Sequence, residues 1–415
     1  MSFELHPILE AGDAPQSGVW YALSPTDASG PGPRVGGCAI TLTARKCVVV
    51  LSGGATPEGS LSDLYLLDTR KDPLKWQKLP SLHLPPRYEH SSFVCGGAVH
   101  VFGGAQEKGP RSDVWKYDTA TGKWAELVVQ GPSPPPRTLY SSCLSRSGTS
   151  PLFVFGGGAT ASAPVDDRNV YTLDQDAARW MCPPTSGKPP CPRQGHACAV
   201  VGNRLFVHGG MAGAEIFGDL HVLDLDSYKW SSPETSGESP PPLAAHGCAV
   251  VGNMLYIFGG LSTEGVATDQ LYALNTVTLK WKKITPSTPP PPSRLDHSMC
   301  SLMWPILQSE GCRSLPLQAT GPSEMGGQMG ERIVTVIGSE LAGDAALSCV
   351  GEADNDQELG TVLEELKDLT LDADTSASSQ WSCEDAIYTC IPALFVYGGM
   401  DTAGNIHGDS FLIVP

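Results

Sequence analysis

The sequence lacks the features that carry proteins into membranes or the secretory pathway. No apolar run approaches the roughly 18 residues of a membrane-spanning helix. The opening stretch MSFELHPILEAGDAP carries acidic residues where a signal peptide needs an apolar core. Asn-x-Ser/Thr sites and Cys-x-x-Cys pairs are also missing, and the 13 cysteines are scattered. This combination argues against a disulfide framework and favours a cytoplasmic protein with reduced thiols.

Positive charge is scarce as well. The chain has 27 lysines and arginines against 44 aspartates and glutamates, which gives a net charge of −17. A field of this sign repels the phosphates of nucleic acids and the anionic lipids of the cytoplasmic leaflet. We therefore expect no nucleic-acid partner, and membrane contact only indirectly through a protein partner.

Glycine and proline are abundant, with 46 and 36 copies in 415 residues. Together with a charged fraction of only 17%, this composition is typical of many short strands joined by tight turns and not of long helices. The length allows two or three average domains, or one large repeat fold.

A repeat with a period of roughly fifty residues decides between these alternatives. Each unit has an apolar run ending in a glycine pair, then an acidic residue that opens another apolar run, then a tryptophan. The glycine pairs are Gly53-Gly54, Gly103-Gly104, Gly156-Gly157, Gly209-Gly210, Gly259-Gly260 and Gly398-Gly399. The acidic residues are Asp63, Asp113, Asp167, Asp219, Asp269 and Asp409. The tryptophans are Trp76, Trp124, Trp180, Trp230 and Trp281.

One unit is predicted to form four strands, as in HACAVV, RLFVHGG, DLHVLDL and KWSS of the fourth unit. The first two are joined by Gly202-Asn203, a tight hairpin signal. A single such sheet cannot bury both faces, whereas sheets arranged radially cover one another. The sixth unit ends at DSFLIVP without a tryptophan strand, and VWYAL near the N-terminus, with Trp20, has the pattern of the missing strand.

These motifs resemble the kelch repeat over residues 33–303 and 393–415. The prediction is an all-β, six-bladed kelch β-propeller closed by its N-terminal strand. Residues 1–32 are predicted to supply the closing strand of blade six, and residues 33–304 to form blades one to five and the first strand of blade six. Residues 305–392 are predicted to be an acidic and largely disordered insertion. Residues 393–415 are predicted to form the remaining strands of blade six.

The insertion interrupts the sixth unit, where 139 residues separate glycine pairs that elsewhere lie about fifty apart. From 305 to 391 it holds sixteen acidic and three basic residues, so it carries most of the net charge. Two alternatives to simple disorder stay open. Residues 332–350, followed by Trp381, faintly resemble part of a seventh blade, and ELGTVLEELKDLTL has helical spacing that suits either a partner-binding helix or a transient one.

The sequence offers few candidates for catalysis or cofactor binding. The recurrent Pro-Arg-x-x-His motif places histidines at His90, His196, His246 and His297. They suggest either a metal ring or structural hydrogen bonding, and equivalent positions in separate blades lie too far apart to share an ion. Glu215 and Asp219 match two of the three ligands of kelch iron binders, but the third position is Leu223. No phosphate-binding loop is present. We expect no enzyme, no cofactor and no metal.

The links between blades hold the candidates for partner binding, because they are predicted to gather on one rim. Arginine and tyrosine are enriched in interface hot spots. In the alternative, each arginine is structural and ties its link to the neighbouring blade. The candidate residues are Arg87, Tyr88, Glu89, Arg137, Arg193, Arg294 and Asp296.

A closer resemblance comes from WYALSP, LPPRYEHSSFV, LFVHGGMAGAEIFGDLHVLDL and RLDHSMCSLMWP, which are similar to stretches of the Rab effectors with kelch motifs. The likeness spans nearly the whole chain. It implies a cytoplasmic effector that binds the GTP-bound form of a late-endosomal Rab, is recruited peripherally to endosomal membranes and promotes endosome to trans-Golgi transport. We expect the protein to be monomeric.

Two other functions of kelch proteins remain alternatives. A substrate receptor or scaffold for a ubiquitin ligase usually carries a BTB domain or a cullin-adaptor box, and neither is visible in the sequence. A structural, actin-associated protein is the third possibility.

Overall fold

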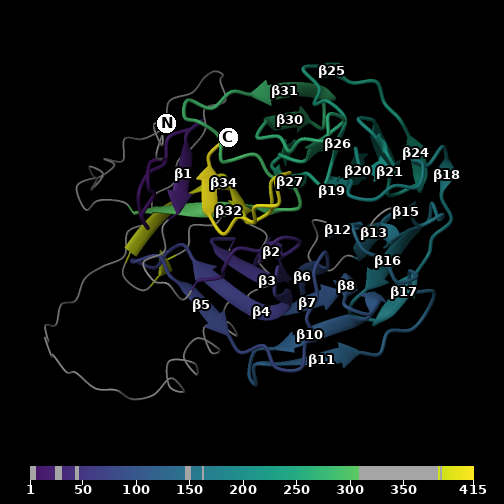
Figure 1. Cartoon of the computed structure of the whole chain (residues 1–415), viewed down its shortest axis with the longest axis horizontal. Helices are drawn as coiled ribbons and strands as arrows, with labels where there is room; N and C mark the ends of the chain where they lie inside the picture. Colours follow the sequence, from purple (N-terminus) through teal and green to yellow (C-terminus); the bar gives the residue numbers. More distant parts are fainter. Residues whose placement is uncertain are drawn as a thin grey trace, which may run out of the picture.

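The computed structural model describes residues 6–23, 30–42, 46–144, 151–160, 163–307, 382–383 and 386–415. Within these residues all regular secondary structure is β, and no helix is long and apolar enough to cross a membrane. Six sheets of four or five strands stand around a common centre (Figure 1). Their first strands lie side by side at that centre. The six-bladed propeller predicted from the repeat is confirmed.

The blades share one antiparallel order, from the innermost to the outermost strand. Blade one is β2 (Cys38–Thr41), β3 (Val48–Thr56), β4 (Gly59–Asp68) and β5 (Trp76–Leu79). Blade two is β6 (Ser91–Cys95), β7 (Ala98–Phe102), β10 (Val114–Asp118) and β11 (Lys123–Leu127). Blade three is β12 (Ser141–Leu144), β13 (Leu152–Phe155), β16 (Val170–Asp174) and β17 (Arg179–Met181).

Blades four and five each add a two-residue strand that runs parallel to the outermost one. Blade four is β19 (Ala197–Val201), β20 (Arg204–His208), β23 (Leu220–Asp224) and β24 (Lys229–Ser231), with β18 (Ser186–Gly187). Blade five is β27 (Gly247–Val251), β28 (Met254–Phe258), β30 (Leu271–Asn275) and β31 (Lys280–Ile284), with β25 (Ser236–Gly237).

Short hairpins follow the second strands and lie against the links. They are β8 (Ala105–Gln106) with β9 (Gly109–Pro110), β14 (Gly158–Thr160) with β15 (Ala163–Pro164), and β21 (Met211–Ala212) with β22 (Glu215–Ile216). In blade five, β29 (Leu261–Ser262) pairs instead with β26 (Leu243–Ala244) of the preceding link.

Blade six closes the ring from both ends of the chain. It consists of β32 (Ser298–Leu307), β34 (Ala386–Tyr397), β35 (Ser410–Ile413) and β1 (Trp20–Leu23), with β33 (Ser382–Cys383) beside β34. The register of β1 on β35 runs from Trp20 opposite Ile413 to Leu23 opposite Ser410. The predicted closure by the N-terminal strand is therefore present.

The core is divided into six apolar clusters, one between each pair of neighbouring blades. The tryptophan of each outermost strand is buried in one of them. Trp180 packs on Phe102 of blade two, with ring centroids 5.0 Å apart, and Trp20 packs on Phe258 of blade five at 5.2 Å. The same burial holds for Trp76, Trp124, Trp230 and Trp281.

The glycine pairs leave space for the histidine or tyrosine side chain that precedes each innermost strand in most blades. Gly209 and Gly210 have φ of +64° and +94°. A Cβ on Gly210 would lie 2.7 Å from the Cβ of His196 in the same blade, and one on Gly209 would lie 3.0 Å from Cε1 of His246 in the next. Steric exclusion from two blades therefore requires glycine at both positions.

The first hairpin of blade six extends into the segment predicted as insertion. Pro305, Ile306 and Leu307 pair with residues from Cys390 back to Tyr388. Both ends of the segment predicted as disordered are therefore β-strands. The rest of it, with the helix at 358–371 and the seventh-blade strands at 332–350, lies outside the described residues.

Candidate functional site

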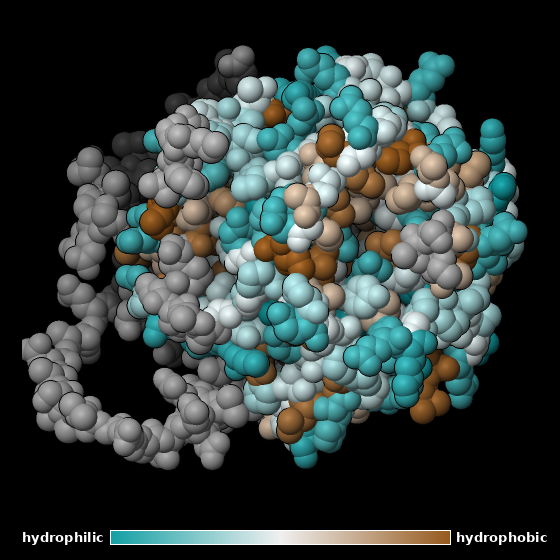
Figure 2. Space-filling model, in the orientation of Figure 1, coloured by the Kyte–Doolittle hydropathy of each residue, from teal (hydrophilic) through white to brown (hydrophobic). Residues whose placement is uncertain are grey.

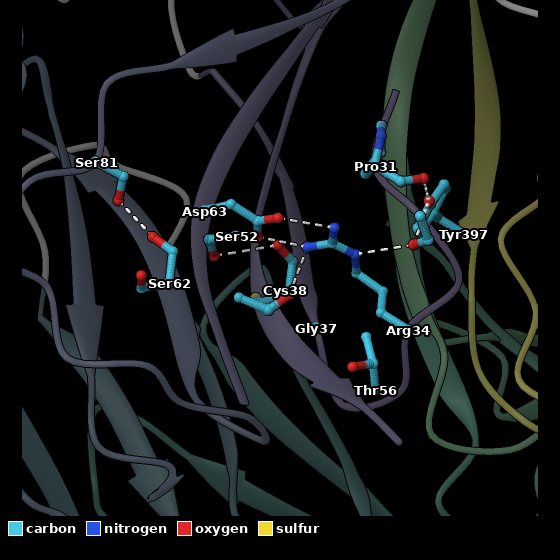
Figure 3. Close-up of polar contacts among 12 residues, drawn as sticks. Pro31, Arg34, Gly37, Cys38, Ser52, Thr56, Ser62, Asp63, Ser81 and Tyr397 are labelled. Atoms are coloured by element: carbon cyan, nitrogen blue, oxygen red, sulfur yellow. Dashed lines mark hydrogen bonds and ion pairs between the residues drawn. The ribbon is translucent and has the colours of Figure 1, made fainter. Parts of the chain in front are cut away.

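Each link arginine lies in a buried pocket made by its own blade. In blade two the Arg87 guanidinium donates to both carboxylate oxygens of Asp113 at 3.0 Å and to the Gly103 carbonyl at 2.9 Å. Figure 3 shows the equivalent Arg34 of blade one, which reaches Asp63. The five pairs are Arg34–Asp63, Arg87–Asp113, Arg137–Asp167, Arg193–Asp219 and Arg294–Asp409.

These pairs remove four of the predicted partner-binding residues from the surface. The side chains of Arg87, Arg137 and Arg294 are 0% exposed and that of Arg193 is 1% exposed. A guanidinium can be buried only when its donors are satisfied, and the carboxylate and carbonyl oxygens satisfy them. These four arginines therefore have a structural role, as in the alternative stated above, but each is bound within its own blade and not to the neighbouring one.

The three other candidates are Tyr88, Glu89 and Asp296. They lie in the links just before the innermost strands of blades two and six, at the end of the central axis that we call the entrance. Two residues after each Arg, or after Leu243 in blade five, the chain turns with a positive φ between +50° and +63°. We call these six residues the turn ring: Gly36, Glu89, Leu139, Gly195, Ala245 and Asp296. Tyr88 precedes Glu89 and is partly exposed.

Backbone hydrogen bonds join the turn ring from blade to blade. The N–H of Glu89 donates to Gly36, Gly36 to Asp296, and Asp296 to Ala245, at 2.6, 3.0 and 2.8 Å. Two further bonds continue to Gly195 and Leu139, at 2.7 and 2.8 Å. The ring therefore holds its side chains in place around the entrance.

Two carboxylates of the turn ring meet over a glycine. A Cβ on Gly36 of blade one would lie 3.2 Å from Cγ of Glu89 in blade two and 3.4 Å from Oδ2 of Asp296 in blade six. Burial, and then the charge of Asp296, raises the pKa of Glu89 to about 8, although the Thr138 hydroxyl donates a hydrogen bond to it. Burial raises the pKa of Asp296 to about 6.

The motif histidines are buried and neutral. Burial lowers the pKa of His90, His196 and His297 to about 3 and that of His246 well below its usual value. The part of the chain that the structure describes contains no group of three or more side chains able to hold a metal ion. The histidines fill the space above the glycine pairs, which agrees with a structural role.

The acidic residues compared above with iron ligands are also separated. Glu215 lies in the exposed hairpin β21–β22. Asp219 accepts hydrogen bonds from Arg193 at 2.6 Å and His221 at 2.7 Å. Although burial opposes it, these two bonds lower the pKa of Asp219. Both of its carboxylate oxygens already accept hydrogen bonds within blade four.

Comparison with known proteins agrees with this architecture. A family model described as the KLHDC2/KLHL20/DRC7 Kelch-repeats domain matches residues 15–149 and 128–307. The chain is 39% identical to the Rab9 effector protein with kelch motifs of Rattus norvegicus, over 98% of each chain. The protein of the same name from Mus musculus is 38% identical over 98% of this chain and 96% of its own. The Homo sapiens protein is 37% identical over 52% and 58%.

This chain belongs to the kelch family of Rab9 effector proteins. The kelch motifs defined by the match run from β1 through blade five into β32, and blade six is completed by β34 and β35.

Sequence reasoning missed two features of this kelch propeller. Trp304 on β32 is fully buried between blades six and one, and its Nε1–H donates to the Asp13 carbonyl at 2.9 Å. Its position before a proline, outside the tryptophan period, gave no signal. The meeting of Glu89 and Asp296 also had no signal, because the two residues belong to different units.

A buried contact between Ser52 and His90 lies near the centre of the propeller. Ser52 Oγ lies 2.9 Å from His90 Nε2 and 2.7 Å from Ser92 Oγ. Ser52 is 0% exposed, and Nδ1 of His90 has no hydrogen-bond partner among the described residues. The contact thus lacks both the access and the orienting acid of a nucleophilic site.

Proposed function

We propose that this protein is a non-enzymatic Rab effector that binds the GTP-bound form of Rab9, a late-endosomal Rab. Through this contact it promotes transport from endosomes to the trans-Golgi network. The observation that carries the proposal is the likeness, over 98% of both chains, to a protein named Rab9 effector protein with kelch motifs. The propeller supports it, because this architecture presents loops of all blades on one face.

The link side of the propeller is the proposed binding face. There the links pair with the hairpins that follow the second strands, as in the bridges Tyr88–Ala105, Gln194–Met211 and Leu295–Met400. Such cross-pairing holds the loops in one arrangement before a partner arrives. A preorganised surface loses little conformational entropy on binding, which favours affinity.

The composition of the surface suits a reversible contact with a soluble domain. Figure 2 shows hydrophobic residues on one face as small groups among hydrophilic ones. With a net charge of −17, the protein has no electrostatic attraction of its own for anionic lipids. We infer that it is a cytoplasmic monomer that the GTPase recruits peripherally to endosomal membranes.

The test is a binding experiment between the purified chain and Rab9 loaded with a non-hydrolysable GTP analogue. We expect saturable binding in this state, and at least about tenfold weaker binding to the GDP-loaded form. An early-endosomal Rab, loaded in the same way, serves as the control for specificity. Equal binding to both nucleotide states, or none to Rab9, would overturn the proposal.

A further inference from the structure

Two cysteine side chains face each other across the interface between blades three and four. Cys143 lies on β12 and Cys198 on β19, the innermost strands of these blades, which are side by side near the centre of the ring (Figure 1). Both cysteines are free thiols in the apolar cluster that joins the two blades. Their Sγ atoms are 3.6 Å apart. The interface therefore brings together two groups that a covalent bond can join.

Backbone and side-chain hydrogen bonds hold the two strands in register at this point. The Ser141 hydroxyl donates to the His196 carbonyl, and each of these residues lies two positions before a cysteine of the pair. In the links just before, the N–H of Gly195 donates to the Leu139 carbonyl at 2.8 Å. Because both strands continue in the same direction from these bonds, the two thiols that follow stay opposite each other.

The equivalent positions at other interfaces, counted from the residue that begins each link motif, have a thiol on one side only. Between blades four and five, Cys248 shares the apolar cluster with Ala199. Between blades six and one, Cys300 shares it with Ala39. A methyl group thus fills one side of this space in two other interfaces. Packing alone does not require sulfur on both sides between blades three and four.

The two thiols differ in their access to solvent. Cys143 is partly exposed, whereas Cys198 is 6% exposed. The contact with Cys143, and then burial, raises the pKa of Cys198 well above its ordinary value, so Cys198 stays protonated. The thiolate is the reactive form of cysteine, and exposure favours its oxidation. A small oxidant therefore reacts first with Cys143.

We propose that Cys143 and Cys198 form a reversible disulfide when the protein meets a peroxide, and that this bond fastens blade three to blade four. The inference goes beyond the proposed function and does not rest on it. In a reducing compartment a disulfide of this kind is transient and acts as a redox sensor. The proposal thus agrees with the reduced thiols expected from the sequence.

Hydrogen peroxide supplies the oxidising equivalents in two steps. The Cys143 thiolate attacks one peroxide oxygen, the O–O bond breaks and hydroxide leaves, so that Cys143 becomes a sulfenic acid. The sulfur of Cys198 then attacks the sulfur of Cys143, the S–O bond breaks, and the hydroxyl group leaves with the Cys198 proton as water. In sum, two thiols and one peroxide give one disulfide and two water molecules.

The second step needs little movement of the strands. The sulfurs of a disulfide lie about 2 Å apart, so from 3.6 Å each has to move by less than about 1 Å. The bond would join residues that are 55 positions apart in the chain. A cross-link over such a loop restricts the unfolded chain and so stabilises the folded one.

The experiment treats the reduced full chain with a small molar excess of hydrogen peroxide, alkylates the remaining thiols in urea and digests the protein with trypsin without reduction. Cleavage at arginine gives the peptides 138–146, with Cys143, and 194–204, with Cys198, and each contains a single cysteine. Mass spectrometry should find the two joined, at the sum of their masses less the two thiol hydrogens, and separate again after dithiothreitol. Both cysteines alkylated, or a link from Cys198 to Cys248 instead, overturns the proposal.

One variant removes the bond and a second serves as its control. Cys143→Ala should fold, because alanine occupies the equivalent position in blades four and five at Ala199 and Ala249, and its 194–204 peptide should be recovered alkylated. Cys191→Ser, at an exposed cysteine, should form the bond like the wild type. Loss of the bond in both variants would mean that it arises by exchange through the surface thiol, and would refute the site.

Thermal melting tests whether the bond fastens the two blades. The oxidised wild type should melt at a higher temperature than the reduced protein, and dithiothreitol should reverse the rise. Cys143→Ala should melt at the same temperature before and after peroxide. If the disulfide forms and the melting temperature is unchanged or lower, the bond does not fasten the blades and the proposal fails.

Discussion

At the scale of the residue, each link arginine is buried and paired with the third-strand aspartate of its own blade. The Asp113 carboxylate accepts from Arg87 and from the indole N–H of Trp115 at 2.7 Å. Although burial opposes it, these bonds lower the pKa of Asp113. The arginine therefore stabilises the beginning of the third strand of its blade. Its effect on partner binding is indirect.

Arg87→Ala should destabilise the protein by about 3–5 kcal/mol, because it leaves a buried carboxylate unpaired. Urea denaturation measures the change, and Rab binding should fall only as folded protein is lost. Arg111→Ala is the control: Arg111 is 47% exposed and 3.9 Å from the same carboxylate, so its removal should cost less than about 1 kcal/mol. Normal stability of Arg87→Ala with weakened binding would instead show a contact role.

At the scale of the element, β1 is the strand on which closure of the ring depends. It covers the edge of β35, and Trp20 fills the cluster between blades five and six. The backbone N–H of Trp20 also donates to the Thr288 hydroxyl at 2.7 Å in the link that leads into blade six. Loss of the strand would expose an unpaired edge and an apolar seam.

We expect Trp20→Ala to lower the free energy of unfolding by about 3–5 kcal/mol, as for other buried aromatic truncations. Deletion of residues 1–24 should reduce it further, because the pairing with β35 is lost as well. Calorimetric melting compares both with the wild type. A truncated protein that melts at the wild-type temperature would show that closure does not need β1.

The long connection between β32 and β34 should not be needed for blade six to form. Leu307 stands opposite Tyr388, so replacing residues 308–387 by Gly-Asn should join β32 to β34 through a tight turn. The circular-dichroism spectrum should stay β-rich, with the melting temperature within a few degrees of the wild type. Replacing 305–392 also removes the β32–β34 pairs of residues 303–307 and should give a less stable protein. Insoluble protein from the shorter replacement would contradict this.

At the scale of the whole molecule, the neutral histidines link stability to pH. Their pKa is near 6.5 in the unfolded chain and about 3 in the fold for His90, His196 and His297. Below pH 6.5 the unfolded state binds protons that the folded state does not, so stability falls as the pH decreases towards 3. Each such histidine contributes up to about 1.4 kcal/mol per pH unit.

We therefore expect the melting temperature to drop steeply between pH 6.5 and 5. His196→Tyr offers a matched variant, because Tyr140 occupies the equivalent position of blade three and its hydroxyl donates to the Phe102 carbonyl at 2.5 Å. The variant should fold and show a shallower dependence, by about one proton. An unchanged dependence would show that His196 does not titrate as inferred.

The amino-acid sequence by itself determined the architecture, because its signals are local and repeated. A glycine pair, an acidic residue and a tryptophan recur in order, and each acts within one blade or on its neighbour. The same locality explains why VWYAL could be assigned to blade six: the last unit lacked one strand and the N-terminus held it.

Only the tertiary structure decided what the link residues do. From the sequence, Arg87 and Glu89 of one link were equally good candidates for partner binding. Packing buries the arginine against Asp113 and leaves the glutamate partly exposed at the entrance. Glu89 belongs to blade two, which follows the blade of Gly36 in the chain, but Asp296 of blade six becomes a neighbour of Gly36 only when the ring closes through β1. Such a contact depends on closure of the whole ring and on burial around it, and no local pattern encodes either.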